Sequence, residues 1–153
     1  MKMRFILVMA ALCLNFCYGQ QKQKQLSPIE LKGCQYGITG FKSGFKAGYV
    51  VSKNSFLKSK AIIVRNYSLS QLFALAMGAG EVIKPENIIV DVREPKKLQQ
   101  LYCYKLIVPP AQVDNFYVLM MQNLIQEFSV YEVKIECRDN KDMMLIKDRD
   151  DEL

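Results

Sequence analysis

The stretch from residue 62 to residue 78 constrains the fold of this chain most, because an apolar strand pattern runs directly into a capped helix pattern. Its first residues are β-branched, which favours a strand. Ser68 is a typical helix N-cap, and Gln71 three residues later completes a capping box. Four apolar residues then recur at helical spacing: Leu69, Leu72, Phe73 and Ala76. We therefore predict a strand that leads into a helix over Leu69–Met77, with Gly78 as a left-handed C-cap.

The rest of the chain contains further strand patterns and one longer helix pattern. Strands are predicted at 88–92, 101–108, 130–137 and 143–147, the last two joined by a hairpin turn at residues 138–141. In the strand at 130–137, four residues are expected to face inward: Tyr131, Val133, Ile135 and Cys137. An apolar stripe predicts a helix over 113–128. Its members are Val113, Phe116, Tyr117, Met120, Met121, Leu124 and Phe128.

The order of these elements predicts the fold class. From residue 61 the order is β-α-β-β-α-β-β, which resembles a split βαβ arrangement. Because each helix pattern has one apolar face, we expect an α+β fold in which two helices pack on one face of a mainly antiparallel sheet. The glycine-rich segment 33–48 predicts short strands N-terminal to this unit.

The first nineteen residues have the pattern of a secretory signal peptide. Lys2 and Arg4 precede an apolar run at 5–14, and the small residue Gly19 follows it. The run is too short for a membrane-spanning helix, which needs about 20 apolar residues. We therefore expect an exported protein, periplasmic or extracellular, with no transmembrane helix in the mature chain.

The remaining sequence suggests one domain with two polar extensions. Residues 20–32 are polar and are expected to form a disordered leader. Residues 33–148 are expected to form a single α+β domain, because this length is close to the commonest domain size. Residues 149–153 form a charged tail.

Charge is distributed unevenly along the chain. Between residues 22 and 65 there are nine basic residues and one acid, whereas ten basic and fourteen acidic residues follow. Two explanations remain open: lysines that solvate edge strands, and a patch that binds an anionic surface. The patch would consist of Lys42, Lys46, Lys53, Lys58 and Lys60. Nucleic acid is not expected as a partner, because an exported chain rarely meets it and no nucleic-acid motif is present.

The absence of histidine limits the chemistry that the chain can perform. Without histidine there is no Ser-His-Asp or Cys-His arrangement. The cysteines outside the signal segment contain no Cys-x-x-Cys pair, so no zinc site is predicted. The acids cluster in turns and in the tail. We therefore expect a protein that is not an enzyme and that uses no cofactor.

Three cysteines lie outside the signal segment, and their roles stay open. Cys103 and Cys137 lie on neighbouring predicted elements, where a disulfide would close a loop of about 35 residues. The alternative is that both are small buried side chains. Cys34 is a candidate free thiol whose pKa could be lowered by the nearby Lys32.

The segment 66–78 resembles a secreted bacterial family of uncharacterised function, often called soil-associated proteins. Its hallmark is a segment like Asn-Val-Ser/Thr-Leu-Arg-Gln-Leu-Ile-x-x-Ala-Tyr-Gly. The matching residues here are Leu69, Gln71, Leu72, Ala76 and Gly78, whereas Ser70 replaces the usual Arg and Met77 the usual Tyr. Residues 88–92, 102–109 and 124–128 look like later parts of the family. The resemblance implies an exported, envelope-associated module, with relatives beside thioredoxin-like or peptidase-sensor domains, and it implies no catalytic residues.

Three functions follow as hypotheses. The first is a non-catalytic interaction or sensory module that binds an envelope protein, or an extended peptide along a sheet edge. The second is an accessory to thiol–disulfide chemistry through Cys34 or through the Cys103 and Cys137 pair. The third is adhesion to anionic envelope polymers through the N-terminal lysines. Asn66-Tyr67-Ser68 is also a formal glycosylation sequon, which we interpret as coincidence.

Overall fold

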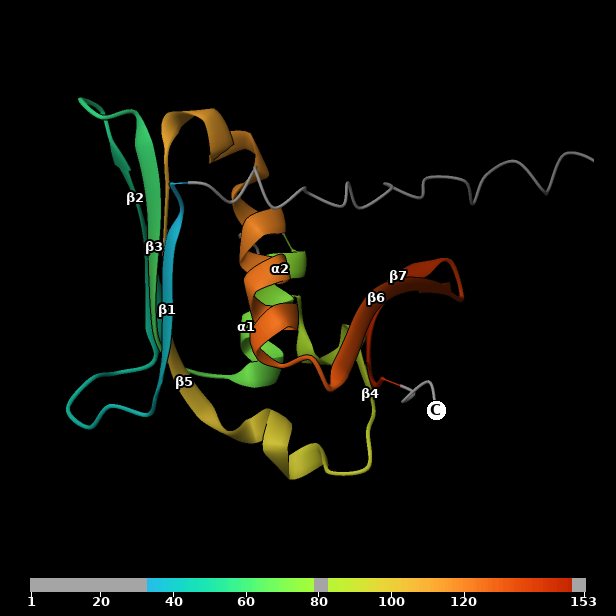
Figure 1. The fold of residues 1–153 in the computed structure, drawn as a ribbon. Helices are drawn as coiled ribbons and strands as arrows, with labels where there is room; N and C mark the ends of the chain where they lie inside the picture. Colours follow the sequence, from blue (N-terminus) through green and yellow to red (C-terminus); the bar gives the residue numbers. More distant parts are fainter. Residues whose placement is uncertain (1–32, 79–82, 150–153) are drawn as a thin grey trace, which may run out of the picture.

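The computed structural model describes residues 33–78 and 83–149, and within them the strands divide between two sheets (Figure 1). Sheet A is antiparallel throughout and has the order β1 (Gln35–Gly40), β5 (Leu101–Val108), β3 (Ser59–Ser68), β2 (Gly48–Asn54). Sheet B has the order β4 (Ile88–Asp91), β7 (Lys141–Asp148), β6 (Tyr131–Arg138). The predicted signal peptide 1–19, the leader 20–32 and the tail beyond Arg149 lie outside the described residues.

Two α-helices lie between the sheets: α1 (Leu69–Met77) and α2 (Phe116–Glu127). Three 3₁₀ turns complete the described elements: η2 (Pro85–Asn87), η3 (Pro95–Gln99) and η4 (Pro110–Asn115). The α+β fold class is therefore confirmed, and both helices do cover one face of sheet A (Figure 1).

The prediction of one sheet is wrong, because sheet B closes over the opposite side of the helices. β4 pairs in parallel with β7, so residues 88–91 leave the layer of sheet A. The reason lies in α1, where only Gln71 is exposed and the remaining positions are buried or half-buried. A helix that is apolar all round needs cover on more than one side. The expectation that α1 has only one apolar face is therefore also wrong.

Most local boundaries agree with the predictions. The capping box of α1 is formed, because the backbone N–H of Gln71 donates to Ser68 Oγ at 3.2 Å and that of Ser68 donates to Gln71 Oε1 at 2.9 Å. The predicted left-handed cap is wrong, since Gly78 has φ −77°. The second helix begins at Phe116 rather than at residue 113, because the prolines at 109–110 start a 3₁₀ turn.

The predicted hairpin turn between β6 and β7 is confirmed, but its strands are packed over only half of their length. Arg138 pairs with Lys141 across the turn, and the two turn residues both have positive φ, 50° and 59°, as a two-residue hairpin loop requires. Tyr131 and Val133 are buried as expected. Ile135 is 43% exposed and Cys137 is exposed, so the expected inward orientation fails where the hairpin extends past the helices (Figure 1).

The core lies between the layers and includes the largest fully buried side chains of α1, α2 and both sheets. Examples are Leu72, Phe73, Leu106, Phe116 and Met144. Among the described residues, neither helix has the length and apolar character that crossing a membrane requires. The face of sheet A that points away from the helices is called the outer face below.

Candidate binding cleft

A β-bulge in β3 shapes the outer face of sheet A. Val64 lies opposite Tyr104 and Tyr67 opposite Tyr102, so three steps along β3 match two steps along β5. The extra residue is accommodated by Asn66, whose φ is +51°. Asparagine adopts this left-handed conformation more readily than most residues. A bulge changes the direction of side chains locally, and here it sets the positions of Arg65 and Asn66.

The Asn66 side chain holds the loop that joins β1 to β2. Its Nδ2 donates to the carbonyl oxygens of Lys42 and Phe45, both at 2.8 Å, and its Oδ1 accepts from the backbone N–H of Lys42 at 2.9 Å. The Cys103 thiol donates to the same Oδ1 at 3.4 Å. Asn66 is only 4% exposed, so these bonds form largely away from water. One buried amide therefore fixes loop 41–47 against sheet A.

The loop and the outer face enclose a cleft of about 440 Å³. Its lining includes sheet residues from three strands and residues of loop 41–47: Gly37, Thr39, Ile63, Arg65, Cys103, Lys105, Lys42 and Phe45. Gly37 faces Lys105 across the β1–β5 ladder, and no atom lies within 4 Å of the position that a Cβ at Gly37 would take. Any side chain at position 37 would therefore partly fill the cleft.

The cleft is cationic, and the described residues place no carboxylate in an ion pair with its cations. The Arg65 guanidinium lies over the Phe45 ring at 5.2 Å, which orients it by a cation–π contact. Among the residues that the structure describes, no ion pair involves Lys42, Arg65 or Lys105. No aspartate or glutamate occurs between residues 33 and 78. The site is therefore suited to an anionic group with an apolar neighbour.

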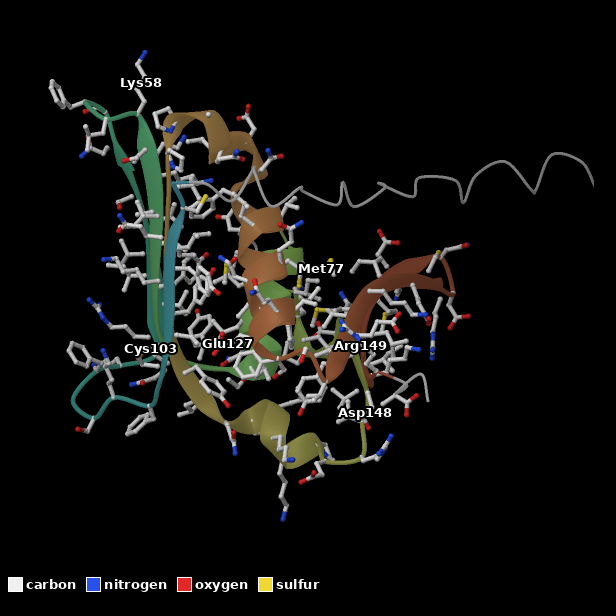
Figure 2. All side chains as sticks on the ribbon, in the orientation of Figure 1. Lys58, Met77, Cys103, Glu127, Asp148 and Arg149 are labelled. Carbon is white, nitrogen blue, oxygen red and sulfur yellow. The ribbon has the colours of Figure 1, made fainter. Side chains whose placement is uncertain are left out.

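The five predicted patch lysines form two groups at opposite ends of sheet A. Lys42 and Lys46 lie in loop 41–47, and only Lys42 lines the cleft. The other three lie at the β2–β3 hairpin, where Figure 2 labels Lys58 at the far end of the sheet. Lys60 Nζ lies over the rings of Phe116 and Tyr117, at 4.3 and 4.7 Å from their centroids.

The disulfide between Cys103 and Cys137 is not formed. Cys103 is a buried free thiol in sheet A, where Figure 2 labels it, whereas Cys137 is an exposed residue of sheet B. The two sheets lie on opposite sides of the helices (Figure 1). Cys34 is a half-buried free thiol, and burial raises its pKa. This direction is the opposite of the one expected from Lys32, and a raised pKa disfavours the reactive thiolate.

The sequence patterns did not indicate several cleft residues: Gly37, Phe45, Arg65, Asn66 and Lys105. The available signal is Asn66, a short polar residue between Arg65 and Tyr67 in a strand pattern, which the sequence by itself indicates only as part of a sequon and of the family-like segment 66–78. Because its Nδ2 is buried and donates to two carbonyls, this atom is already engaged in holding the loop.

Among the described residues there is no group of His, Cys, Asp or Glu that could hold a metal ion.

Comparison of the chain with protein-family models, curated proteins and solved structures finds no match. The resemblance to the soil-associated proteins therefore stays a prediction, and the site is interpreted from its own geometry.

Proposed function

We propose that this protein is an exported, non-catalytic binding module of the bacterial envelope that holds an acidic, extended peptide segment of a partner protein in the cleft of sheet A. The observation that carries this proposal is that cations without an ion-pair partner among the described residues lie beside aromatic and aliphatic side chains in one cleft. Arg65 and Lys105 offer donors to carboxylates, and Phe45 and Ile63 offer apolar contact.

The geometry favours an extended ligand over a compact one. In an extended peptide every second side chain points the same way, so acidic residues at alternate positions can meet Arg65 and Lys105. A guanidinium binds a carboxylate through two parallel N–H donors, and the cation–π contact with Phe45 holds the Arg65 guanidinium beside the apolar part of the cleft. β1 is an edge strand among the described residues, since it pairs only with β5. Peptide backbone can therefore add along its other side.

The two alternative functions have less support. A thiol accessory needs an accessible thiolate, but the Cys103 thiol is buried and donates to Asn66, and burial raises the pKa of Cys34. Adhesion to a long anionic polymer needs a continuous basic surface, but the lysines lie in two separate groups.

The test is the binding of fluorescein-labelled peptides to the full chain, measured by fluorescence anisotropy. The probe alternates glutamate and valine, and the control peptide carries glutamine in place of glutamate. We expect binding of the acidic peptide that weakens as salt rises, because exposed charges are screened. Equal binding of the two peptides would overturn the proposal.

A matched pair of glycine variants locates the peptide on the protein. Gly37→Val places a side chain in the cleft, whereas Gly40→Val places one in open space on the same strand outside the cleft lining. Neither glycine has positive φ, so both variants should fold. We expect Gly37→Val to weaken binding at least about tenfold, on the order of 1.4 kcal/mol, and Gly40→Val to leave it unchanged. If Gly40→Val weakened binding more than Gly37→Val did, the peptide would bind outside the cleft.

Export is tested separately by expressing the full chain in a bacterial host and measuring the mass of the protein in each fraction. We expect an envelope or secreted form that begins near Gln20. A cytoplasmic form that retains Met1 and no processed form would contradict export, but not peptide binding.

A further inference from the structure

The tip of the β2–β3 hairpin presents two large apolar side chains to solvent. Phe56 is 91% exposed and Leu57 is 58% exposed. The tip is nevertheless held in shape, because the backbone N–H of Leu57 donates to Asn54 Oδ1 at 2.8 Å. Burial in the core therefore does not explain these side chains, and their presentation at the end of a fixed turn suggests a role outside the core.

The same end of sheet A is basic. Lys58 follows the apolar pair directly and has φ +51°. Lys53 lies opposite Lys60 across the β2–β3 ladder, a like-charge pair that is unfavourable by itself. Burial and the charge of Lys53 both lower the pKa of Lys60. An anionic group at this end would relieve the repulsion.

We propose that the hairpin tip, residues 54–59, docks on an anionic phospholipid bilayer, with Phe56 and Leu57 entering the headgroup region while Lys53 and Lys58 contact lipid phosphates. An apolar pair between cations is the chemistry of an interfacial anchor. A soluble polyanion would use the lysines but would gain nothing from Phe56. Lipid is therefore the ligand that accounts for both kinds of residue.

This inference does not rest on peptide binding. The cleft is formed by loop 41–47 and the middle of sheet A, whereas the tip lies at the opposite end of the sheet (Figure 1). A molecule docked through its tip would leave the cleft open. The two functions can therefore succeed or fail separately.

The chain contains no tryptophan, so Phe56→Trp introduces a single fluorescent reporter at the tip. The variant is mixed, as the full chain, with vesicles of equal parts phosphatidylglycerol and phosphatidylcholine. We expect a blue shift of the emission and quenching by lipids brominated near the headgroup end of the acyl chain. Because the signal segment itself can bind lipid, a signal from position 56 is required, and total sedimentation would not suffice.

Further comparisons make the experiment decisive. Ile135→Trp, on the exposed half of β6, is the matched control and should show no quenching. Phosphatidylcholine vesicles and soluble polyphosphate should leave the emission of Phe56→Trp unchanged. Adding Lys53→Gln or Lys58→Gln to Phe56→Trp should weaken binding about fivefold each, as expected for one cation near an anionic surface.

The proposal fails if the emission of Phe56→Trp is not quenched in anionic vesicles, or if that of Ile135→Trp is quenched equally. It also fails if soluble polyphosphate produces the same blue shift, since the ligand would then be a polyanion and not a bilayer. Replacing Leu57 with serine in the Phe56→Trp variant offers a further check. It should weaken vesicle binding by about tenfold, as expected for the loss of one leucine from an apolar environment.

Discussion

The solvent-facing charges of the two sheets are arranged in opposite ways. On sheet B, Glu136 pairs with Lys134 and with Arg138, both at 3.0 Å, and Glu132 pairs with Lys147 across the strands at 3.1 Å. On sheet A, the described residues supply no carboxylate to Arg65, Lys105 or Lys42. A face that neutralises its own charges has little to offer an ion, whereas a cationic face with a cleft retains its charge for a partner.

The sheets also differ in how they use left-handed asparagine. Asn140 in the β6–β7 turn and Asn66 in the β3 bulge have nearly the same φ, 59° and 51°. Asn140 is exposed in a turn that any residue tolerating this conformation could form. Asn66 is buried and makes the three hydrogen bonds that hold loop 41–47. The left-handed conformation of Asn140 thus only reverses the chain in sheet B. In sheet A the same conformation at Asn66 also places the side chain that holds the loop of the cleft.

The largest expected effect on stability comes from a pair of single variants in which Asn66 or Asn140 is replaced by glycine. Glycine keeps the left-handed conformation accessible. Asn66→Gly should lower the free energy of unfolding by about 2 to 4 kcal/mol, because it removes three hydrogen bonds of about 1 kcal/mol each and leaves their partners unsatisfied. Asn140→Gly should change it by less than about 0.5 kcal/mol. Urea denaturation measures both values. Equal losses would mean that Asn66 matters only for its backbone.

A second pair of variants tests how far sheet B is packed. Val133 is 5% exposed and Ile135 is 43% exposed, although both lie on the same face of β6. Val133→Ala should cost about 2 kcal/mol, as expected for two buried methyl groups. Ile135→Ala should cost less than about 1 kcal/mol. If Ile135→Ala cost as much as Val133→Ala, the outer half of the hairpin would be packed in solution, as the sequence pattern had suggested.

Local patterns were predicted well because a few neighbouring residues decide them. Ser68 and Gln71 specify the start of α1 within one turn, and the Asp139-Asn140 pair specifies the hairpin turn. Each depends on side chains that contact backbone a few positions away. Tertiary structure therefore changed these elements little.

The arrangement of the sheets could not be predicted from alternation alone. Whether β4 joins β5 or β7 depends on what covers α1 outside its predicted apolar stripe, and Ala74 and Leu75, which lie outside that stripe, are buried. Their apolar character is visible in the sequence, but it does not say which strand covers them. The cleft depends on more distant contacts, since Arg65 and Lys105 line the same cleft only because β3 pairs with β5 in a register that places Ile63 opposite Lys105. No local pattern reports that register.

The smallest expected effect is a difference between the two sheets in how the loss of one charged side chain changes stability with pH. Lys134 and Arg138 hold the pKa of Glu136 below its ordinary value, chiefly through side-chain hydrogen bonds. Because the pKa is lower in the folded state, the stabilisation is present above the unfolded pKa and is lost as pH falls through the folded pKa. Glu136→Gln should therefore be slightly less stable than the wild type near neutral pH and equally stable in acid, with the difference reduced by salt. Lys105→Gln removes a cation of sheet A that has no ion pair among the described residues, and this variant should show no such loss at any pH. Urea denaturation of both variants from acid to neutral pH measures these differences. If Lys105→Gln were less stable than the wild type near neutral pH but equally stable in acid, Lys105 would have a carboxylate partner. The contrast between the charges of the two sheets would then be wrong.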